Sequence, residues 1–257
     1  GKNVLYMFSR TQQHAAIGIE FDPRWNDKEI NGKAAQECCK AYNNRKYLFC
    51  EVTMDGISIG GLLDGMSYDD FEELVMLPLY EPEVDDSKPI ISTSSRVFYW
   101  DLDSEFGHNL HGTITLEFND QELLQLRSLN PFQNYGIDGH TYEQNKKNMF
   151  KYLNSKPECR TKVKAIADYI KDTINLENLP EIDLVQFTLD FAQAPNITYC
   201  VDENSSSINY AKEYMRFPDE VLFDKEGDCD CKSSLTAALF HELGYNVIMM
   251  LSTKLGH

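Results

Sequence analysis

Apolar residues at helical spacing dominate the second half of the chain. In residues 159–174 they recur every three or four positions, so they lie along one side of a helix. The apolar positions of this predicted helix are Val163, Ile166, Ala167, Ile170 and Ile174. Residues 183–193 predict a second helix, more apolar and therefore more buried, and residues 141–153 predict a third. The last predicted helix covers residues 229–243.

The first 120 residues instead contain short runs of β-forming residues separated by turns. The predicted strands are residues 4–9, 15–21, 47–54, 90–101 and 110–118. Two short helices are predicted among them, one over residues 33–42 from its apolar spacing and one opening at Ser67, which would cap it. The acidic stretch of residues 81–86, with prolines at 78 and 82, is typical of a linker.

The change from strand-like to helical patterns predicts an α+β protein with two regions. Residues 1–93 are expected to form a separate α/β or β-rich N-terminal domain of unassigned role. Residues 94–257 are expected to form a second domain around the helix of residues 229–243. A strand predicted over residues 247–251 follows that helix.

Composition narrows the functional classes. The 257 residues are 42% hydrophobic and 12% aromatic, which is enough for a core. A net charge of -17 argues against nucleic-acid binding, which needs a basic surface. No apolar run has the length of a transmembrane helix. Gly1 and its neighbours lack the regions of a signal peptide, and an upstream signal or anchor is compatible with this start. The localisation therefore stays open between the cytoplasm and the soluble portion of an anchored extracytoplasmic protein.

The seven cysteines do not form a disulfide framework, since their number is odd and their spacing is irregular. One of them begins the last predicted helix. Asp228 is suited to cap that helix by accepting from backbone N–H groups two or three residues on. Cys229 then falls in the first turn, where the helix dipole and free N–H groups favour the thiolate and lower the pKa of the thiol. Gly244 suits the left-handed position just past the helix end.

A histidine at the end of the sequence is within reach of this thiol. A helix from Cys229 to Leu243 rises about 21 Å, and a returning strand covers that distance in roughly seven residues. The strand comes level with Cys229 near Leu251, and residues 252–256 leave slack to place His257 beside Cys229 as a general base. The spacing permits this pair without requiring it: Cys229 can equally be a buried helix-start cysteine and His257 an ordinary residue.

Several motifs occur in a fixed order towards the end of the chain. They are Gly227-Asp228-Cys229-Asp230-Cys231, Leu243-Gly244-Tyr245 and Gly256-His257, preceded by residues 191–199 (Phe-Ala-Gln-Ala-Pro-Asn-Ile-Thr-Tyr) and 213–222 (Glu-Tyr-Met-Arg-Phe-Pro and Val-Leu). This order resembles the transglutaminase-like superfamily, in particular its bacterial and archaeal cysteine proteinase group. That group has Gly-Asp-Cys-Glu-Asp, a helix, Leu-Gly-Tyr, a strand and Gly-His. The resemblance covers about residues 95–257 and is strongest over 180–257.

The resemblance implies a papain-like α+β core, with the nucleophile helix packed on an antiparallel sheet, and a Cys-His-Asp catalytic triad. Carried over by position, Cys229 is the nucleophile and His257 the base. A third residue, Asp or Asn, would orient the imidazole from a strand after the histidine. The sequence stops at the histidine, so the domain is expected to be truncated at its C-terminal end.

The chain departs from the family pattern after the cysteine. Asp230 keeps an acidic side chain there, but Cys231 places a thiol where the family has an acid, which suggests a resolving cysteine or a metal ligand. The oxyanion donor is open between the backbone N–H of Cys229 and, less favoured, the side chain of Gln193.

Metal and cofactor sites are weaker alternatives. A zinc set of the two thiols with His241 and His257 is disfavoured by the tight Cys-x-Cys spacing. His108 and His111 are more simply read as part of a solvated turn between strands. No glycine-rich phosphate loop is present. We therefore expect neither a metal nor a cofactor.

Two functions of different classes follow from these patterns. The first is a thiol hydrolase or acyltransferase that acts on peptide or amide bonds of a protein or peptide substrate. The second is a catalytically inactive transglutaminase-like module that binds a protein or peptide partner. Within the first, hydrolysis is favoured over transfer to an amine, because water needs no second substrate site.

Overall fold

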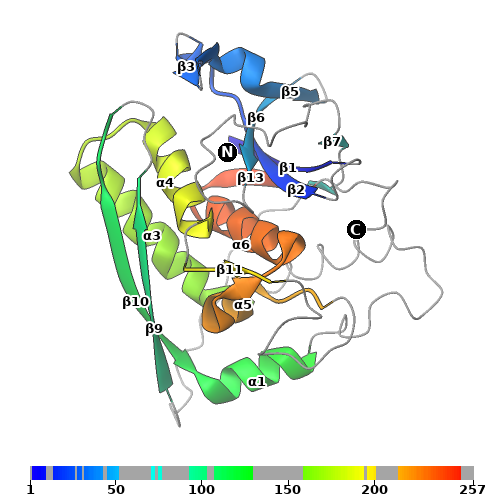
Figure 1. Cartoon of the computed structure of the whole chain (residues 1–257), viewed down its shortest axis with the longest axis vertical. Coiled ribbons are helices and arrows are strands. Elements are labelled where there is room, and N and C mark those ends of the chain that lie inside the picture. The colour runs from blue at the N-terminus through cyan, green and yellow to red at the C-terminus, as the bar shows by residue number, and fades with distance from the viewer. Residues whose placement is uncertain are drawn as a thin grey trace, which may run out of the picture.

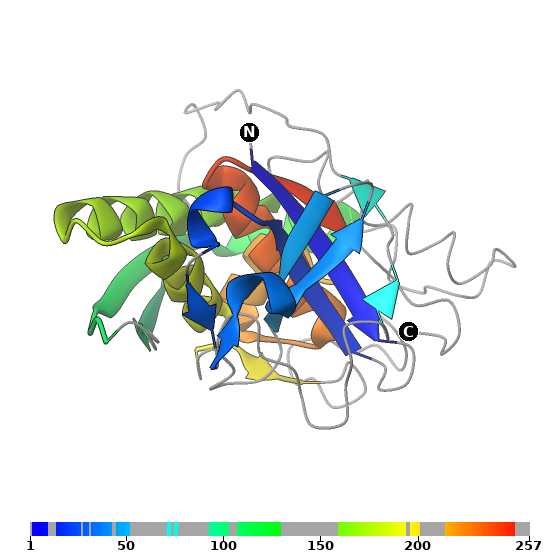
Figure 2. The ribbon, with the colours of Figure 1, turned by 90° about the horizontal axis from the view of Figure 1, so that it is seen from above.

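The computed structural model describes residues 2–9, 14–26, 28–30, 32–42, 45–51, 71–72, 75–76, 93–102, 107–129, 159–193, 196–200 and 214–249. Within them the protein is a mixed α+β structure (Figure 1). The helix α6 (Cys229–Glu242) lies between a sheet and a group of helices, and a two-stranded hairpin packs on those helices from outside (Figures 1 and 2). The α+β class predicted from the sequence is therefore confirmed.

The sheet is built largely from the first part of the chain. Its strands are β1 (Lys2–Ser9), β2 (His14–Glu20), β5 (Cys39–Tyr42), β6 (Arg45–Glu51), β7 (Phe71–Glu72), β8 (Val75–Met76) and β13 (Tyr245–Met249). Among the described residues their order is β5-β6-β2-β1-β13-β8, with β7 paired to β1. The β1–β2, β2–β6 and β5–β6 pairs are antiparallel, whereas β13 runs parallel to β1.

The parallel pair joins the two ends of the described chain. β1 and β13 pair from Lys2 with Tyr245 to Leu5 with Ile248. The sequence patterns predicted a separate region in residues 1–93 and an antiparallel sheet behind the cysteine helix. Instead, strands from both sides of residue 93 share one sheet, and that sheet is mixed. A pairing between segments so far apart in sequence leaves no local pattern from which it could be predicted.

Three strands predicted early in the chain are confirmed as β1, β2 and β6 within the described residues. The helix predicted over residues 33–42 is wrong. This segment consists of β4 (Lys33–Ala34), one 3-10 turn (Ala35–Cys38) and β5. The turn buries Ala35 and Cys38, and the residues after it pair with β6, which satisfies their backbone groups where a short isolated helix would be marginal.

Smaller elements complete this part. A 3-10 turn covers Pro23–Trp25, and β3 (Glu29–Ile30) pairs with β4. The predicted cap Ser67 and the predicted linker of residues 78–86 lie outside the described residues. The helix predicted to open at Ser67 is wrong at Phe71 and Glu72, which form the strand β7.

The helices around α6 agree well with the apolar pattern. They are α1 (Asp120–Leu129), α3 (Thr161–Leu176), α4 (Glu181–Gln193) and α5 (Pro218–Asp224). The helices predicted over residues 159–174 and 183–193 are confirmed as α3 and α4, and all five apolar residues predicted for α3 are buried. Residues 141–153 lie outside the described residues, and α1 and α5 were not predicted. None of the described helices combines the length and apolar character needed to cross a membrane.

The predicted strands on either side of residue 107 form a hairpin of β9 (Thr93–Asp101) and β10 (His111–Asn119). Trp100 is its buried centre, with its ring centroid 5.0 Å from those of Phe187 and Phe191 in α4. Gly112 faces Trp100 across the ladder, and a Cβ at this position would lie 2.3 Å from the indole. Glycine is therefore required there for the indole to lie over β10 and reach α4.

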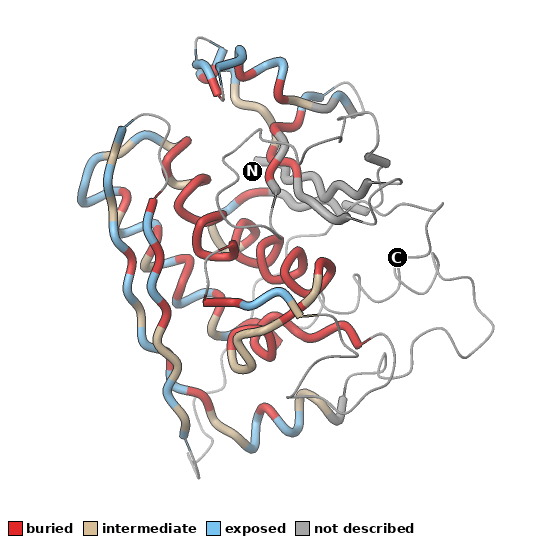
Figure 3. The backbone as a smooth tube through the Cα atoms, viewed as in Figure 1, coloured by how far each residue is buried: buried red, intermediate tan, exposed pale blue. Residues whose placement is uncertain are grey.

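The helix α6 is enclosed on all sides. Every residue from Cys229 to His241 is buried, which Figure 3 shows as a continuous red helix. Leu235, Ala238 and Leu239 give α6 one apolar face, yet its polar residues are buried as well. They are buried because β1, β2 and β13 also pack on α6. As predicted, Gly244 lies just past the end of the helix in the left-handed region, with a φ of +90°.

Asp219 of α5 caps the start of α3. Its carboxylate accepts hydrogen bonds from Thr161 Oγ1 at 2.8 Å and from the backbone N of Lys162 at 3.1 Å. Burial raises the pKa of Asp219 from 3.8 to about 6, although these hydrogen bonds act in the opposite direction. The ionised carboxylate is therefore less stable in the folded protein than in the unfolded chain.

We expect Asp219→Asn to remove a pH dependence of unfolding. The folded protein binds this proton more tightly than the unfolded chain, so the contribution to stability is present below pH 3.8 and is lost as the pH rises through 6. Relative to the variant, the free energy of unfolding of the wild type should fall by roughly 2 to 3 kcal/mol across that window. Urea unfolding at several pH values measures this change. Asp168→Asn, at an exposed site, is the control, and identical profiles for wild type and Asp219→Asn contradict the prediction.

Candidate functional site

The start of α6 gathers the residues around Cys229. Asp228 is the N-cap predicted from the sequence, and its Oδ1 accepts from the backbone N of Cys231 at 3.2 Å. Cys229 is the first residue of the helix and keeps 8% of its surface exposed, whereas Cys231 is fully buried. Of these two cysteines, Cys229 is the less deeply buried.

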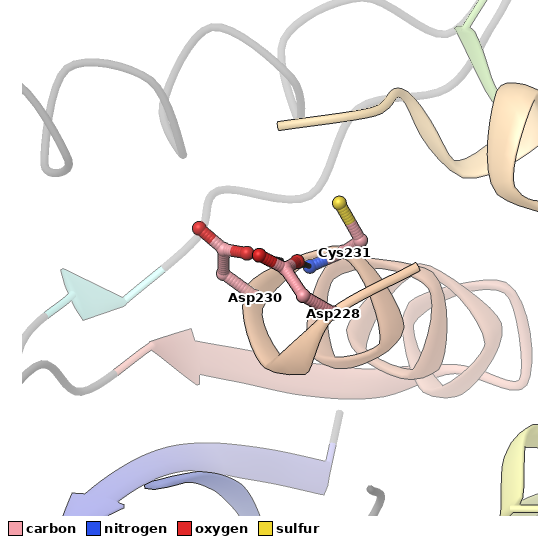
Figure 4. Close-up of side chains that lie close together, drawn as sticks. All are labelled: Asp228, Asp230 and Cys231. Atoms are coloured by element: carbon pink, nitrogen blue, oxygen red, sulfur yellow. Dashed lines mark hydrogen bonds between the residues drawn. The ribbon is translucent and has the colours of Figure 1, made fainter. Parts of the chain in front are cut away.

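Two carboxylates lie beside this helix start. Asp230 Oδ1 accepts from the same backbone N of Cys231 at 3.1 Å. Figure 4 shows the Asp228 and Asp230 side chains meeting on one side, while the Cys231 sulfur points away from them. The three residues offer potential metal-ligand atoms within 4.8 Å of one another. The carboxylates are nevertheless engaged in capping the helix.

Cys231 belongs to the packing of the protein interior. Its Sγ accepts from the backbone N of Arg216 at 3.3 Å and donates to the carbonyl oxygen of Tyr214 at 3.7 Å. It also lies within the main hydrophobic cluster, beside Leu235. A metal ion or a disulfide at this sulfur would have to break these contacts. The geometry therefore favours a structural role over the resolving-cysteine and metal-ligand roles suggested by the sequence.

A short parallel ladder places the residues just before the helix. It consists of β11 (Thr198–Tyr199) and β12 (Glu226–Gly227), with Tyr199 paired to Gly227. A Cβ at Gly227 would lie 2.8 Å from the Cys231 Cβ, closer than two such atoms approach in proteins. Glycine at this position is thus what allows β12 to turn tightly into α6.

Buried charges hold α5 and β12 in place. Arg216 has no exposed surface, and its guanidinium binds Asp224 at 3.2 Å and Glu226 at 3.0 Å. Arg127 of α1 binds Glu220 at 3.1 Å and also contacts Asp224. The sequence patterns gave Arg216 no role of its own. The feature of the sequence that could have identified Arg216 is the motif of residues 213–222, in which this charged residue stands among apolar ones.

The other predicted site residues are not all brought to Cys229. His257 lies outside the described residues. The strand β13 packs along α6, and Leu251, where the returning strand was expected to come level with Cys229, also lies outside the described residues. Gln193 is the last residue of α4 and is 4% exposed. The oxyanion role suggested for Gln193 stays a prediction.

The described histidines considered as metal ligands have other partners. His241, near the far end of α6, accepts at Nδ1 from Arg160 Nη1 at 2.8 Å. His108 Nδ1 lies 2.5 Å from Asp183 Oδ2, and His111 Nδ1 lies 2.5 Å from an oxygen of another aspartate, Asp101. These contacts place the three imidazoles in three separate ion pairs or hydrogen bonds.

Comparisons with models of known protein families, with curated proteins and with solved structures each found no match to this chain.

We expect Arg216→Met to destabilise the protein strongly. The substitution removes the buried guanidinium that binds both Asp224 and Glu226, which costs roughly 3 kcal/mol or more. Lys164→Ala is the matched control, because it breaks an exposed ion pair with Asp168 and should cost under about 0.5 kcal/mol. Urea unfolding of the wild type and of the two variants measures the free energy of unfolding of each. Equal losses in the two variants would show that Arg216 does not hold this region together.

Proposed function

We propose that the protein is a cysteine-dependent hydrolase or acyltransferase that acts on peptide or amide bonds, with Cys229 as the nucleophile. The observation that carries this proposal is the position of Cys229, at the start of a buried helix, where it keeps more exposed surface than Cys231. The dipole and N–H groups at a helix start favour a thiolate over a thiol. The motifs that resemble the transglutaminase-like superfamily support the same chemistry and a papain-like arrangement.

In the proposed reaction His257 first takes the proton of the Cys229 thiol. The sulfur attacks the carbonyl carbon of a peptide or glutamine amide, and the C=O π electrons move to the oxygen. When this oxyanion collapses, the C–N bond breaks and the amine leaves with the proton from the His257 imidazolium. Water then attacks the thioester to release a carboxylic acid, or a primary amine attacks it to form a new amide. Either route restores the thiol.

Iodoacetamide labelling tests the nucleophile. At pH 6 we expect Cys229 to be alkylated about tenfold or more faster than Cys200, because an activated thiolate persists at a pH where an ordinary thiol is protonated. Timed labelling followed by peptide mapping measures both rates in one sample. Cys200 is partly exposed and serves as the reference. Burial raises the pKa of Cys39 to about 12, so Cys39 serves as the slow control.

Cys229→Ala should abolish the fast labelling and leave the rate at Cys200 unchanged. Equal rates at Cys229 and Cys200 from pH 5 to pH 8 would argue against an activated thiolate. That outcome would favour the alternative, a catalytically inactive module that binds a protein or peptide partner.

The fate of the acyl group separates hydrolysis from transfer. Denatured casein is incubated with the full chain and a fluorescent primary amine. We expect new peptide fragments or released ammonia without incorporation of the amine, because water requires no second binding site. Transfer predicts fluorescent casein instead, and Cys229→Ala should lose either product. If fast alkylation of Cys229 accompanies neither product, casein amides are not substrates and the proposed amide chemistry is contradicted.

A further inference from the structure

The side chain of Tyr199 projects from the face of β11 that lies toward the helix α6. Tyr199 and Gly227 are directly paired in the β11–β12 ladder, and paired residues project from the same face of a sheet. A Cβ at Gly227 would point at Cys231, in the first turn of α6. The Cα–Cβ bond of Tyr199 therefore points toward the helix turn that carries Cys229.

The backbone around Tyr199 is fixed on both sides. Thr198 N donates to the Lys225 carbonyl at 2.9 Å, and Cys200 N donates to the Gly227 carbonyl at 3.2 Å. From α6 itself, the buried Lys232 donates its Nζ to the carbonyl oxygen of Ile197 at 3.1 Å. These hydrogen bonds tie the Tyr199 segment to residues two and four positions before Cys229 and three positions after it.

The hydroxyl of Tyr199 is free to bind an incoming group. The side chain is 48% exposed, and among the described residues its hydroxyl has no hydrogen-bond partner. Burial of part of the ring raises the pKa of Tyr199, and the negative charges of Cys229 and Asp228 raise it further. The phenol therefore keeps its proton and serves as a hydrogen-bond donor throughout the pH range of a thiol enzyme.

We propose that the Tyr199 hydroxyl donates a hydrogen bond to the oxyanion formed when Cys229 attacks its substrate. This role rests on the proposed function. As the S–C bond forms, the carbonyl π electrons move to the oxygen, and the phenol stabilises that charge without giving up its proton. Tyr199 thus fills the donor position for which the sequence suggested Gln193. A buried residue at the end of α4 is less accessible to a substrate than a half-exposed phenol.

Two reagents separate oxyanion stabilisation from activation of the thiol. p-Nitrophenyl acetate acylates Cys229 through a tetrahedral oxyanion, whereas iodoacetamide alkylates it by displacement at a saturated carbon. For Tyr199→Phe in the full chain we expect acylation to slow by about tenfold to 10²-fold, in the range for loss of one oxyanion donor. Alkylation should stay within about twofold of wild type. Nitrophenolate release, corrected with Cys229→Ala, and peptide mapping measure the two rates.

Tyr99→Phe is the matched control, because Tyr99 is 61% exposed on β9 and should leave both rates unchanged. Unchanged acylation in Tyr199→Phe overturns the proposal. An equal fall in both rates also overturns it, because Tyr199 would then act on the thiol or on the local fold. A wild-type Cys229 that reacts with neither reagent overturns the proposed function itself, and the role of Tyr199 with it.

Discussion

The enclosure of α6 is the constraint on which the rest of the structure depends. Burial on every side favours internal hydrogen bonds for polar side chains, and Ser233 and Thr236 make them by donating to carbonyls one turn back. The helix is closed only when both the sheet and the surrounding helices are in place, so the pairing of β13 with β1 is part of the core. Chemistry on α6 is then confined to its ends, and Cys229 is the less deeply buried of the two cysteines at its start.

Buried ion pairs fix the position of the segment that leads into the start of α6. Desolvation offsets most of the attraction in pairs such as Arg216 with Asp224, so these pairs add little stability over a well-packed apolar alternative. Their effect is geometric, because the Arg216 guanidinium holds together a carboxylate of α5 and one of β12, those of Asp224 and Glu226. Glu226 is held by Arg216 and is followed directly by Gly227 and the cap Asp228. The position of Cys229 therefore depends on ion pairs that do not touch it.

Local signals predicted the local structure, and contacts between distant segments decided the rest. The helix α3 could be predicted because its apolar stripe is contained in its own sequence, and the cap Asp228 because it needs only the next three residues. Residues 33–42 also have helical spacing, yet they form β4, a 3-10 turn and β5, and β5 finds a hairpin partner in β6. In the site, Arg216 and Tyr199 stand in recognisable motifs. Their burial and pairing arise from contacts with other segments, which no single-sequence pattern contains.

Electrostatics indicate what kind of group can assist a thiol here. The carboxylates of Asp228 and Asp230 share one backbone N–H in the first turn, and their charge opposes a thiolate at Cys229. The dipole and free N–H groups at the helix start act in the opposite direction and favour the thiolate. A proposed cationic base such as His257 would stabilise the thiolate but would also be attracted by the acids. A neutral phenol does not compete for those acids, because it adds no charge. For that reason Tyr199 suits an oxyanion that forms only transiently in an acid-rich site.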